Sequence, residues 1–218
     1  MADVIAIDGP SASGKGTVAS RVAEAFGMDY LDSGALYRLT ALYAQRQGAA
    51  WSDGTAVAVL AANLPAEFAD GKILLDGEDV GAEIRSEAVG MGASEVARHP
   101  EVRTALLQRQ RDFQTASGLV ADGRDMGSVV FPDAVLKIFL TASAQIRAQR
   151  RAAQLGLPCE GAAFERILSD IEARDEADRC REAAPLKQLP DALLLDTSDM
   201  GIEEAVKKVI DWYEQKQK

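Results

Sequence analysis

The stretch that decides the fold is AIDGPSASGKGTVASR, residues 6–21. It follows the short β-branched run DVIAI, residues 3–7, which is typical of a central strand buried on both faces. After it, Val18, Val22 and Phe26 recur at helical spacing, so residues 17–26 are predicted to form a helix that Gly27 caps. The order strand, glycine loop, helix predicts the opening of an α/β fold.

The loop GPSASGKGT, residues 9–17, has the chemistry of a phosphate site. Gly9, Gly14 and Lys15 occupy the G-x-x-x-x-G-K positions, where backbone N–H groups and a helix N-terminus surround phosphate oxygens. Lys15 supplies a point charge for the β- and γ-phosphates. The alternative is a purely structural glycine turn, but the flanking strand and helix favour phosphate binding. The residues predicted to hold these phosphates are Gly9, Pro10, Ser11, Ala12, Ser13, Gly14, Lys15, Gly16 and Thr17.

Gly16 stands where the usual pattern has Ser or Thr, and Thr17 restores a hydroxyl one residue later. The Thr17 hydroxyl is expected to reach either a magnesium ion, directly or through water, or the α- and β-phosphates. Asp8 is open to two interpretations: it helps to hold a metal ion through water, or it simply ends a strand.

Later segments extend the α/β pattern. Apolar runs at 119–122, 134–140 and 192–196 predict further buried strands with helices between them, which indicates a parallel sheet with right-handed crossovers. A last helix is expected after the TSD start signal at 197–199. Residues 66–81 differ, because two Asp-Gly pairs separate three short strand-like pieces, a pattern typical of successive hairpins.

Composition limits the class of protein. The chain has 218 residues, enough for one domain, and 34 acidic against 24 basic residues give a net charge of −10. This balance disfavours long nucleic acids as partners. No uncharged run approaches the about 18 residues of a membrane span, so we expect a soluble, cytoplasmic protein. Cys159 and Cys180 show no metal-like spacing and are expected to be ordinary residues.

Four motifs carry a family resemblance. GKGT in the first loop is typical of nucleoside monophosphate kinases, and LDSGALYR (31–38), ADGRDMG (121–127) and ARDEADRCREAAPL (173–186) resemble the bacterial cytidylate kinases in order and spacing over nearly the whole chain. The resemblance implies a single P-loop kinase domain over 1–218 with a five-stranded parallel sheet, a three-stranded antiparallel insertion over 63–84 in the monophosphate-binding region, and a short lid over 152–164.

The same resemblance implies a reaction and its residues. ATP would donate its γ-phosphoryl group to CMP or dCMP by in-line transfer with Mg²⁺, giving ADP and CDP or dCDP. Ser33, Arg38 and Arg124 would hold the acceptor phosphate, and Ser94, Arg103 and Asp125 would contact the cytosine. Arg174 and Asp178 would reach the ribose, and Arg181 the transferring phosphate. The catalytic set implied in this way is Lys15, Arg124, Arg151 and Arg181.

Some assignments stay open at this point. Arg174, Asp178 and Arg181 share one helix face by their spacing, although a surface salt-bridge ladder would show the same spacing. Any of Arg147, Arg150 and Arg151 is a candidate to reach the ATP phosphates when the lid closes.

Two further side chains have competing interpretations. Asp122 either orients metal-bound water or starts a turn, and His99 is expected to begin a helix or lie on the surface rather than to act as a base.

Two other functions compete with this one. A kinase for shikimate or a nucleoside would share the loop, but it would have no reason to carry Ser94, Arg103 and Asp125. A nucleotide-dependent switch would need no second, arginine-rich site, and the chain has no Asn-Lys-x-Asp guanine-reading motif. We therefore expect small nucleotides as partners, no nucleic acid or membrane, and a monomer.

Overall fold

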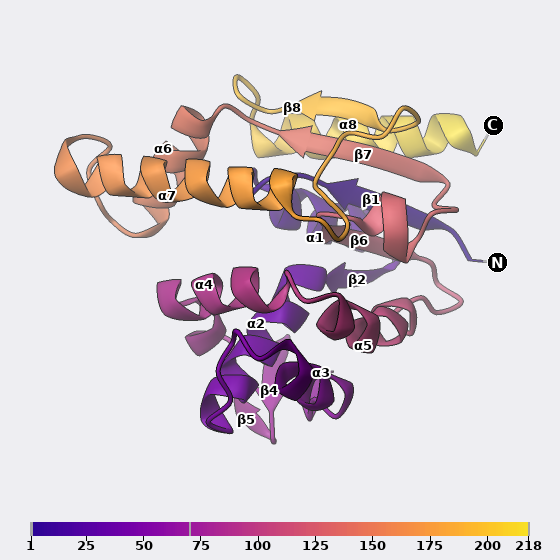
Figure 1. Ribbon diagram of the computed structural model, residues 1–218. Coiled ribbons are helices and arrows are strands. Elements are labelled where there is room, and N and C mark those ends of the chain that lie inside the picture. Colours follow the sequence, from indigo (N-terminus) through magenta and orange to yellow (C-terminus); the bar gives the residue numbers. More distant parts are fainter. Residues whose placement is uncertain (1, 70, 218) are drawn as a thin grey trace. The chain divides into compact units, whose positions relative to one another are not determined.

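The computed structural model describes residues 2–69 and 71–217. Its chain forms two compact units, drawn in Figure 1. The first, here called the large unit, comprises Met1–Leu31 and Phe113–Lys218; the second, the small unit, comprises Asp32–Asp112. The chain therefore leaves the large unit after residue 31 and returns to it at residue 113 for the rest of the sheet.

A five-stranded sheet in the order β2-β6-β1-β7-β8 is the centre of the large unit. Its pairs β6–β1, β1–β7 and β7–β8 are parallel, which confirms the predicted α/β class. The central strand β1 is buried along its whole length, as its β-branched sequence predicts. The strands are β1 (Val4–Asp8), β2 (Asp29–Asp32), β6 (Leu119–Gly123), β7 (Leu136–Thr141) and β8 (Leu193–Asp196).

Helices α1 (Lys15–Phe26) and α8 (Ile202–Lys216) enclose the main core with the sheet. Val18 and Val22 of α1 and Val209 of α8 are buried there beside Ile5 and other strand residues. Gly27 ends α1 in the left-handed region with φ 63°, where its N–H donates to the carbonyls of Ala23 and Glu24. The predicted helix and its glycine cap are confirmed.

The predicted last helix is confirmed, but the TSD segment does not cap its start. Helix α8 begins at Ile202 after Gly201, without a side-chain cap, instead of at the TSD segment. The hydroxyls of that segment form hydrogen bonds to residues of the neighbouring strands. Thr197 Oγ1 donates to the Thr141 carbonyl at 3.1 Å, and Ser198 Oγ donates to Asp196 Oδ1 at 2.6 Å. These residues therefore tie the loop after β8 to the sheet edge instead of starting a helix.

Helices α6 (Ala144–Gln154) and α7 (Gly161–Cys180) pack on each other in the large unit (Figure 1). Their contact is a small apolar cluster of Ala148, Ala152, Phe164 and Ile171. The segment 152–164 covers the end of α6, the connection between the helices and the start of α7. A short π-helical turn, η2 (Met126–Val130), follows β6.

The small unit holds helices and the second sheet. Its three-stranded antiparallel sheet has the order β3-β4-β5, which confirms the predicted hairpins. Asp76 and Gly77 both have positive φ, 52° and 79°, the conformation that a two-residue hairpin turn needs; the other Asp-Gly pair includes residue 70, outside the described residues. Its elements are α2 (Ser33–Arg46), α3 (Gly54–Ala62), β3 (Ala66–Ala69), β4 (Lys72–Leu75), β5 (Glu78–Asp79), η1 (Glu83–Arg85), α4 (Glu87–Val96) and α5 (Pro100–Arg111).

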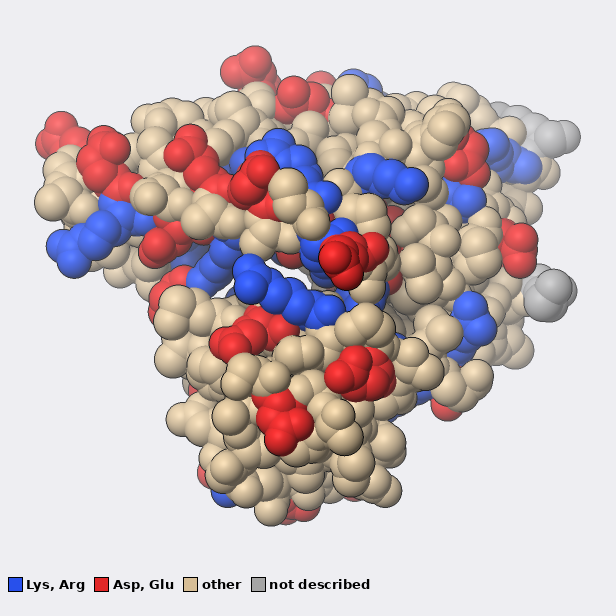
Figure 2. All heavy atoms as spheres, in the orientation of Figure 1, with Lys and Arg blue, Asp and Glu red and all other residues tan. Residues whose placement is uncertain are grey.

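Among the described residues, no helix is long and apolar enough to cross a membrane. Basic and acidic side chains are interspersed on the face shown in Figure 2. That face therefore has no broad basic surface of the kind that tracks a nucleic-acid backbone.

Candidate functional site

The glycine loop joins β1 to α1 and is held against the sheet. The N–H of Gly9 donates to the carbonyl of Gly123 on β6 at 3.2 Å. A Cβ at Gly9 would lie 2.0 Å from the carbonyl oxygen of Leu140 on β7, so no other residue fits. At the far end of the loop, Gly14 has φ 89°, and Ala12 within the loop has φ 56°. Glycine is therefore required at both ends of the loop, at Gly9 because a Cβ would clash and at Gly14 because φ is positive.

Polar groups of the loop are available to an anion. Helix α1 begins after Gly14 with no side-chain cap, so its first-turn amides point out of the helix end without a side-chain acceptor. The Ser13 side chain is 1% exposed, and its hydroxyl oxygen has no hydrogen-bond partner within the described part of the chain. A buried hydroxyl without a partner is costly, and a phosphate oxygen would supply one. This loop therefore fits a phosphate group.

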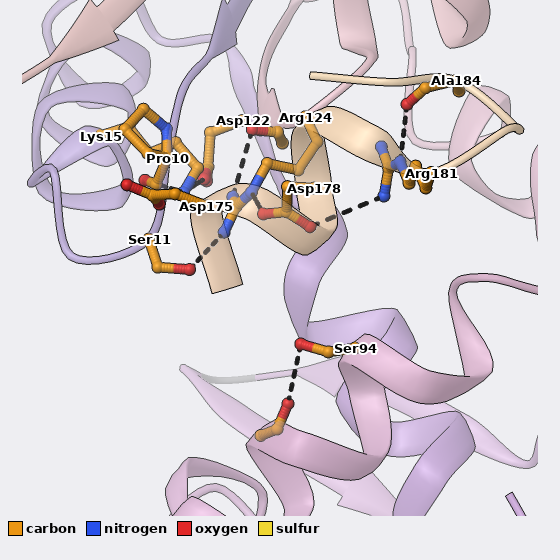
Figure 3. A network of polar contacts seen from close by, with 12 residues as sticks. Pro10, Ser11, Lys15, Ser94, Asp122, Arg124, Asp175, Asp178, Arg181 and Ala184 are labelled. Carbon is orange, nitrogen blue, oxygen red and sulfur yellow. Dashed lines mark hydrogen bonds and ion pairs between the residues drawn. The ribbon is translucent and has the colours of Figure 1, made fainter. Parts of the chain in front are cut away.

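Lys15 lies between the loop and β6. Its Nζ donates to the Pro10 carbonyl at 3.4 Å and lies 4.0 Å from Asp122 Oδ2, and only 12% of its side chain is exposed (Figure 3). The ammonium is thus held at the phosphate loop with a carboxylate beside it. This is the position from which a lysine can neutralise nucleotide phosphates.

Asp122 receives a second contact that the sequence does not reveal. Tyr30 on β2 donates its hydroxyl hydrogen to Asp122 Oδ1 at 2.7 Å. The same hydroxyl explains Gly16, because a Cβ at that position would lie 3.3 Å from the Tyr30 oxygen and 3.8 Å from Asp122 Oδ1. Asp122 therefore contacts Tyr30 and Lys15 with its two oxygens instead of starting a turn.

Asp8, the last residue of β1, has a definite role in the structure. Its Oδ1 accepts from the Met126 N–H and its Oδ2 from the Gly127 N–H, both at 2.8 Å. The two amides form the start of η2, so the carboxylate caps a turn that lies 118 residues away in the chain. Burial raises the pKa of Asp8 to about 6, against the lowering effect of the two N–H donors.

Arg124 connects the phosphate loop to α7. Its Nε donates to Asp178 Oδ2 at 2.6 Å and its Nη2 to Ser11 Oγ at 2.8 Å (Figure 3). Burial alone would lower the pKa of Arg124, but the nearby charge of Asp178 outweighs it and the pKa lies above its ordinary value. Burial likewise raises the pKa of Asp178, and the charge of Arg124 brings it below its ordinary value. Both groups are therefore held ionised beside the loop.

Arg181 departs from the predicted helix face. Helix α7 ends at Cys180, and Arg181 is extended with φ −65° and ψ 140°. Its side chain turns back instead: Nη1 lies 3.9 Å from Asp178 Oδ1, and Nε donates to the Ala184 carbonyl at 2.7 Å (Figure 3). The prediction that Arg174, Asp178 and Arg181 share one helix face is wrong, but Arg181 still joins Arg124 and Asp178.

Two arginines of α6 donate hydrogen bonds to backbone carbonyls of the phosphate loop. Arg147 donates to the Ser11 carbonyl at 3.1 Å and makes a buried, bidentate ion pair with Asp175 of α7, with contacts of 3.1 and 2.5 Å. Arg150 donates to the Ser13 carbonyl at 3.1 Å, and burial lowers its pKa. Arg151 contacts Gln154 at 3.5 Å. Arg147 and Arg150 are thus bound to the loop backbone in this structure and are not separate from it as residues of a lid would be.

In the small unit, predicted acceptor residues surround α4. Arg38 of α2 donates to the Ile84 carbonyl at 2.7 Å, and its guanidinium lies 3.2 Å from the Cβ position of Gly90. Ser94 donates to the Gly90 carbonyl at 3.3 Å (Figure 3). Arg103 of α5 stacks over the Tyr37 ring at 5.7 Å. The unit thus brings Arg38 and Ser94 to one helix.

The remaining predicted residues are placed as follows. Ser33 opens α2 and is buried, Asp125 is buried at the start of η2, Arg174 is half-buried on α7, and Thr17 is exposed in the first turn of α1. His99 precedes Pro100 as the N-cap residue of α5, which confirms that it begins a helix.

Sequence reasoning missed Tyr30, Asp175 and the contact from Arg124 to Ser11, because each joins segments far apart in the chain and none lies in a recognisable pattern.

Known proteins match the chain over nearly its full length. A family model described as Cytidylate kinase matches residues 5–215. A cytidylate kinase of Neisseria meningitidis serogroup A is 73% identical over 210 residues, covering 96% of this chain and 96% of that protein. A cytidylate kinase of Chromobacterium violaceum is 60% identical over 214 residues, covering 98% and 96%.

Among solved structures, an uncharacterized protein from Eubacterium ventriosum superposes with a TM-score of 0.51 over 96% of this chain and 97% of that one. At 12% sequence identity, this likeness concerns the fold alone.

Proposed function

The chain belongs to the cytidylate kinase family, and from this premise we propose that it transfers the γ-phosphoryl group of ATP to CMP and to dCMP, giving ADP and CDP or dCDP, with Mg²⁺. One observation carries the proposal. The phosphate loop, Lys15, Arg124 and Arg181 form one connected set of contacts in the large unit, running through Ser11, Asp122 and Asp178. Donor-binding and charge-neutralising groups are therefore built as a single assembly.

The donor phosphates bind to the loop in this proposal. The first-turn amides of α1, the Ser13 hydroxyl and Lys15 replace the water that the β- and γ-phosphates lose on binding. The Leu140 carbonyl beside Gly9 and the hydrogen bonds from Arg147 and Arg150 to loop carbonyls keep this backbone in place before substrate arrives. Such preorganisation lowers the reorganisation needed when charge develops.

Arginines neutralise the transferring phosphoryl group. Transfer between two nucleotides brings several negative charges together, and little covalent work is left for the protein. Arg124 and Arg181 both contact Asp178, which orients their guanidinium groups beside the loop. Arg151, on the same helix as Arg147 and Arg150, is proposed to complete the set when the segment 152–164 closes as a lid.

The oxygen donors beside the loop suit Mg²⁺. Magnesium in kinases is held mainly by nucleotide phosphates and water, with one or two protein oxygens. Asp122 supplies a carboxylate next to Lys15, and Thr17 supplies a hydroxyl in the first turn of α1. These two residues would hold the ion, directly or through water, and the ion would offset phosphate charge during transfer. This chain's own part is to keep Asp122 oriented and Lys15 at the loop.

The acceptor roles follow the family pattern, residue by residue. We assign the acceptor phosphate to Ser33, Arg38 and Arg124, the cytosine to Ser94, Arg103 and Asp125, and the ribose to Arg174 and Asp178. A site that hydrogen-bonds the base discriminates strongly, because a wrong base leaves buried polar groups unpaired. The three-stranded sheet within 63–84 is proposed to close over the monophosphate.

A coupled assay of ADP release across AMP, GMP, UMP, CMP and dCMP tests the proposal. CMP and dCMP should be the best acceptors, and a clear preference for UMP or AMP would refute the substrate assignment. Lys15→Ala should lower turnover by about 100-fold or more without unfolding the chain, because the Lys15 side chain contacts the loop and Asp122 and is not part of the main apolar core. Full activity in that variant would refute the donor site.

A further inference from the structure

Gly16 lacks the Ser or Thr side chain that most phosphate loops carry after the lysine. The space where that side chain would lie is occupied by the side chain of Tyr30, which comes from strand β2. The Tyr30 hydroxyl lies 3.3 Å from where a Cβ of residue 16 would stand. Tyr30 belongs to β2, which neighbours β6, the strand of Asp122. A hydroxyl is therefore present at this place, but a phenol on the sheet supplies it and not the loop.

The hydroxyl is aimed at a functional group. It donates to Asp122 Oδ1 at 2.7 Å, while Asp122 Oδ2 lies 4.0 Å from Lys15 Nζ. The Asp122 side chain is 6% exposed and the ring of Tyr30 packs against the main core. Because the ring is held by packing and the carboxylate is largely buried, this hydrogen bond fixes which oxygen of Asp122 faces the loop.

We propose that Tyr30 is a positioning residue for the phosphoryl donor: its hydroxyl stands in for the one missing at residue 16 and orients Asp122 toward Lys15 and the nucleotide phosphates. The proposal rests on the proposed function. It accounts for two facts together, namely that residue 16 is glycine and that a buried carboxylate beside the loop is shared between a phenol and a lysine. No proton leaves Tyr30, since the group acts by orientation alone.

The first test is Tyr30→Phe, which deletes one oxygen and keeps the packed ring. We expect kcat to fall about 10- to 100-fold, the usual effect of losing a group that orients a metal-site ligand, while KM for CMP stays unchanged. Calorimetric titration should show weaker binding of ADP with Mg²⁺ and unchanged binding of ADP with EDTA. Equal weakening in both titrations would overturn the proposal, because it would assign Tyr30 to the shape of the loop itself.

A second test asks whether Tyr30 acts through Asp122. In an Asp122→Asn background, Tyr30→Phe should cause no further loss of kcat, since the oriented carboxylate is already gone. Independent, multiplying losses would contradict the proposal. Loss of folding in both backgrounds, read as a collapse of the thermal unfolding midpoint, would also overturn it by assigning Tyr30 to the core.

A third test restores the hydroxyl from the loop. Gly16→Ser alone should lower kcat, because its Cβ would stand 3.3 Å from the Tyr30 oxygen. The same change in Tyr30→Phe has room and should raise kcat above that of Tyr30→Phe. Absence of this rescue would count against the replacement of one hydroxyl by the other.

The matched control is Tyr213→Phe, which breaks a phenol-to-carboxylate bond to Asp3 of 2.8 Å on the C-terminal helix and should leave kcat unchanged. An equal loss in this control would show that the effect of Tyr30→Phe is not specific and would contradict the proposal. Wild-type turnover in the same assay separates the two claims. Absence of CMP-dependent ADP release in the wild type refutes the proposed function, whereas wild-type turnover with an unaffected Tyr30→Phe refutes the role of Tyr30 alone.

Discussion

At the scale of single residues, Gly9 is the most constrained position of the phosphate loop. A methyl group there would meet the Leu140 carbonyl oxygen at 2.0 Å, and because the nearest atoms all belong to the Leu140 backbone, no flexible side chain can move away. We expect Gly9→Ala to lower the free energy of unfolding by about 3 kcal/mol or more, as severe overpacking does. Urea unfolding measures it.

Gly201→Ala is the matched control for that change. It adds a methyl in open space at a residue with φ −74°, and it should leave the stability nearly unaltered. Similar losses in the two variants would contradict the steric account of Gly9.

The raised pKa of Asp8 predicts that the free energy of unfolding depends on pH with a definite sign. Its pKa rises from 3.8 in the unfolded chain to about 6 in the folded one, because burial disfavours the charged form. The folded state then binds the proton more tightly, so this contribution to stability is full below pH 4 and is lost as the pH rises through 6. The loss amounts to about 3 kcal/mol for a shift of this size.

The measurement compares wild type with Asp8→Asn, which cannot titrate, by urea unfolding at pH 4 and pH 7. The difference in unfolding free energy, wild type minus variant, should shrink by up to about 3 kcal/mol as the pH rises. A constant or growing difference would show that the carboxylate is not penalised by burial.

The sequence predicts those residues of the site whose role is written in local pattern. Gly9, Gly14 and Lys15 are readable because a strand, a tight loop and a helix N-terminus demand them at fixed spacing. Tyr30 and Asp8 are not readable as site residues, since each acts on a partner about 90 or more residues away, at a distance in sequence that only the folded sheet closes. Arg124, Asp178 and Ser11 are predicted from the sequence as site residues, but the contacts that join Arg124 to the other two are not.

At the scale of elements, the buried pair of Arg147 and Asp175 joins α6 to α7. Their side chains are 5% and 11% exposed, so removing one charge leaves the other buried without its partner. Asp175→Asn should therefore lower the unfolding free energy by about 3–5 kcal/mol. It should also weaken ATP binding, because Arg147 holds the Ser11 carbonyl of the loop.

The control for that pair is Glu176→Gln, one residue further along α7. It breaks an exposed ion pair with Arg179 and should cause no measurable change in stability. Equal effects of the two variants would mean that the buried pair adds nothing to the packing of α6 on α7.

Helices, strands and turns are predictable from the sequence where periodicity or turn chemistry is strong. The predictions fail where tertiary contacts determine the local structure. The hairpin at Asp76-Gly77 and the cap at Gly27 follow from local conformation. The short strand β2 was not assigned, because its sequence DYLD has no apolar run; its place beside β6 makes it a strand. Helix α7 stops before Arg181, whose side chain is instead drawn to Asp178 and Ala184.

At the scale of the whole molecule, ligand binding should raise the free energy of unfolding. In the proposed function, ATP binds the folded loop and not the unfolded chain, so ATP at 100 times its Kd should add about 2.7 kcal/mol to the unfolding free energy. The loop variant Lys15→Ala should lose most of this gain at the same ATP concentration. An equal gain in both proteins would place ATP away from the loop.

The net charge of −10 disfavours long nucleic acids and leaves room for small phosphorylated ligands at locally basic positions. Membership of the cytidylate kinase family indicates nucleotide substrates. The most direct measurement is separation of the nucleotides after incubation of the full chain with ATP, CMP and Mg²⁺. The account predicts ADP and CDP in equal amounts, and no ADP when CMP is left out. ATP consumption without CDP, or no consumption at all, would contradict it.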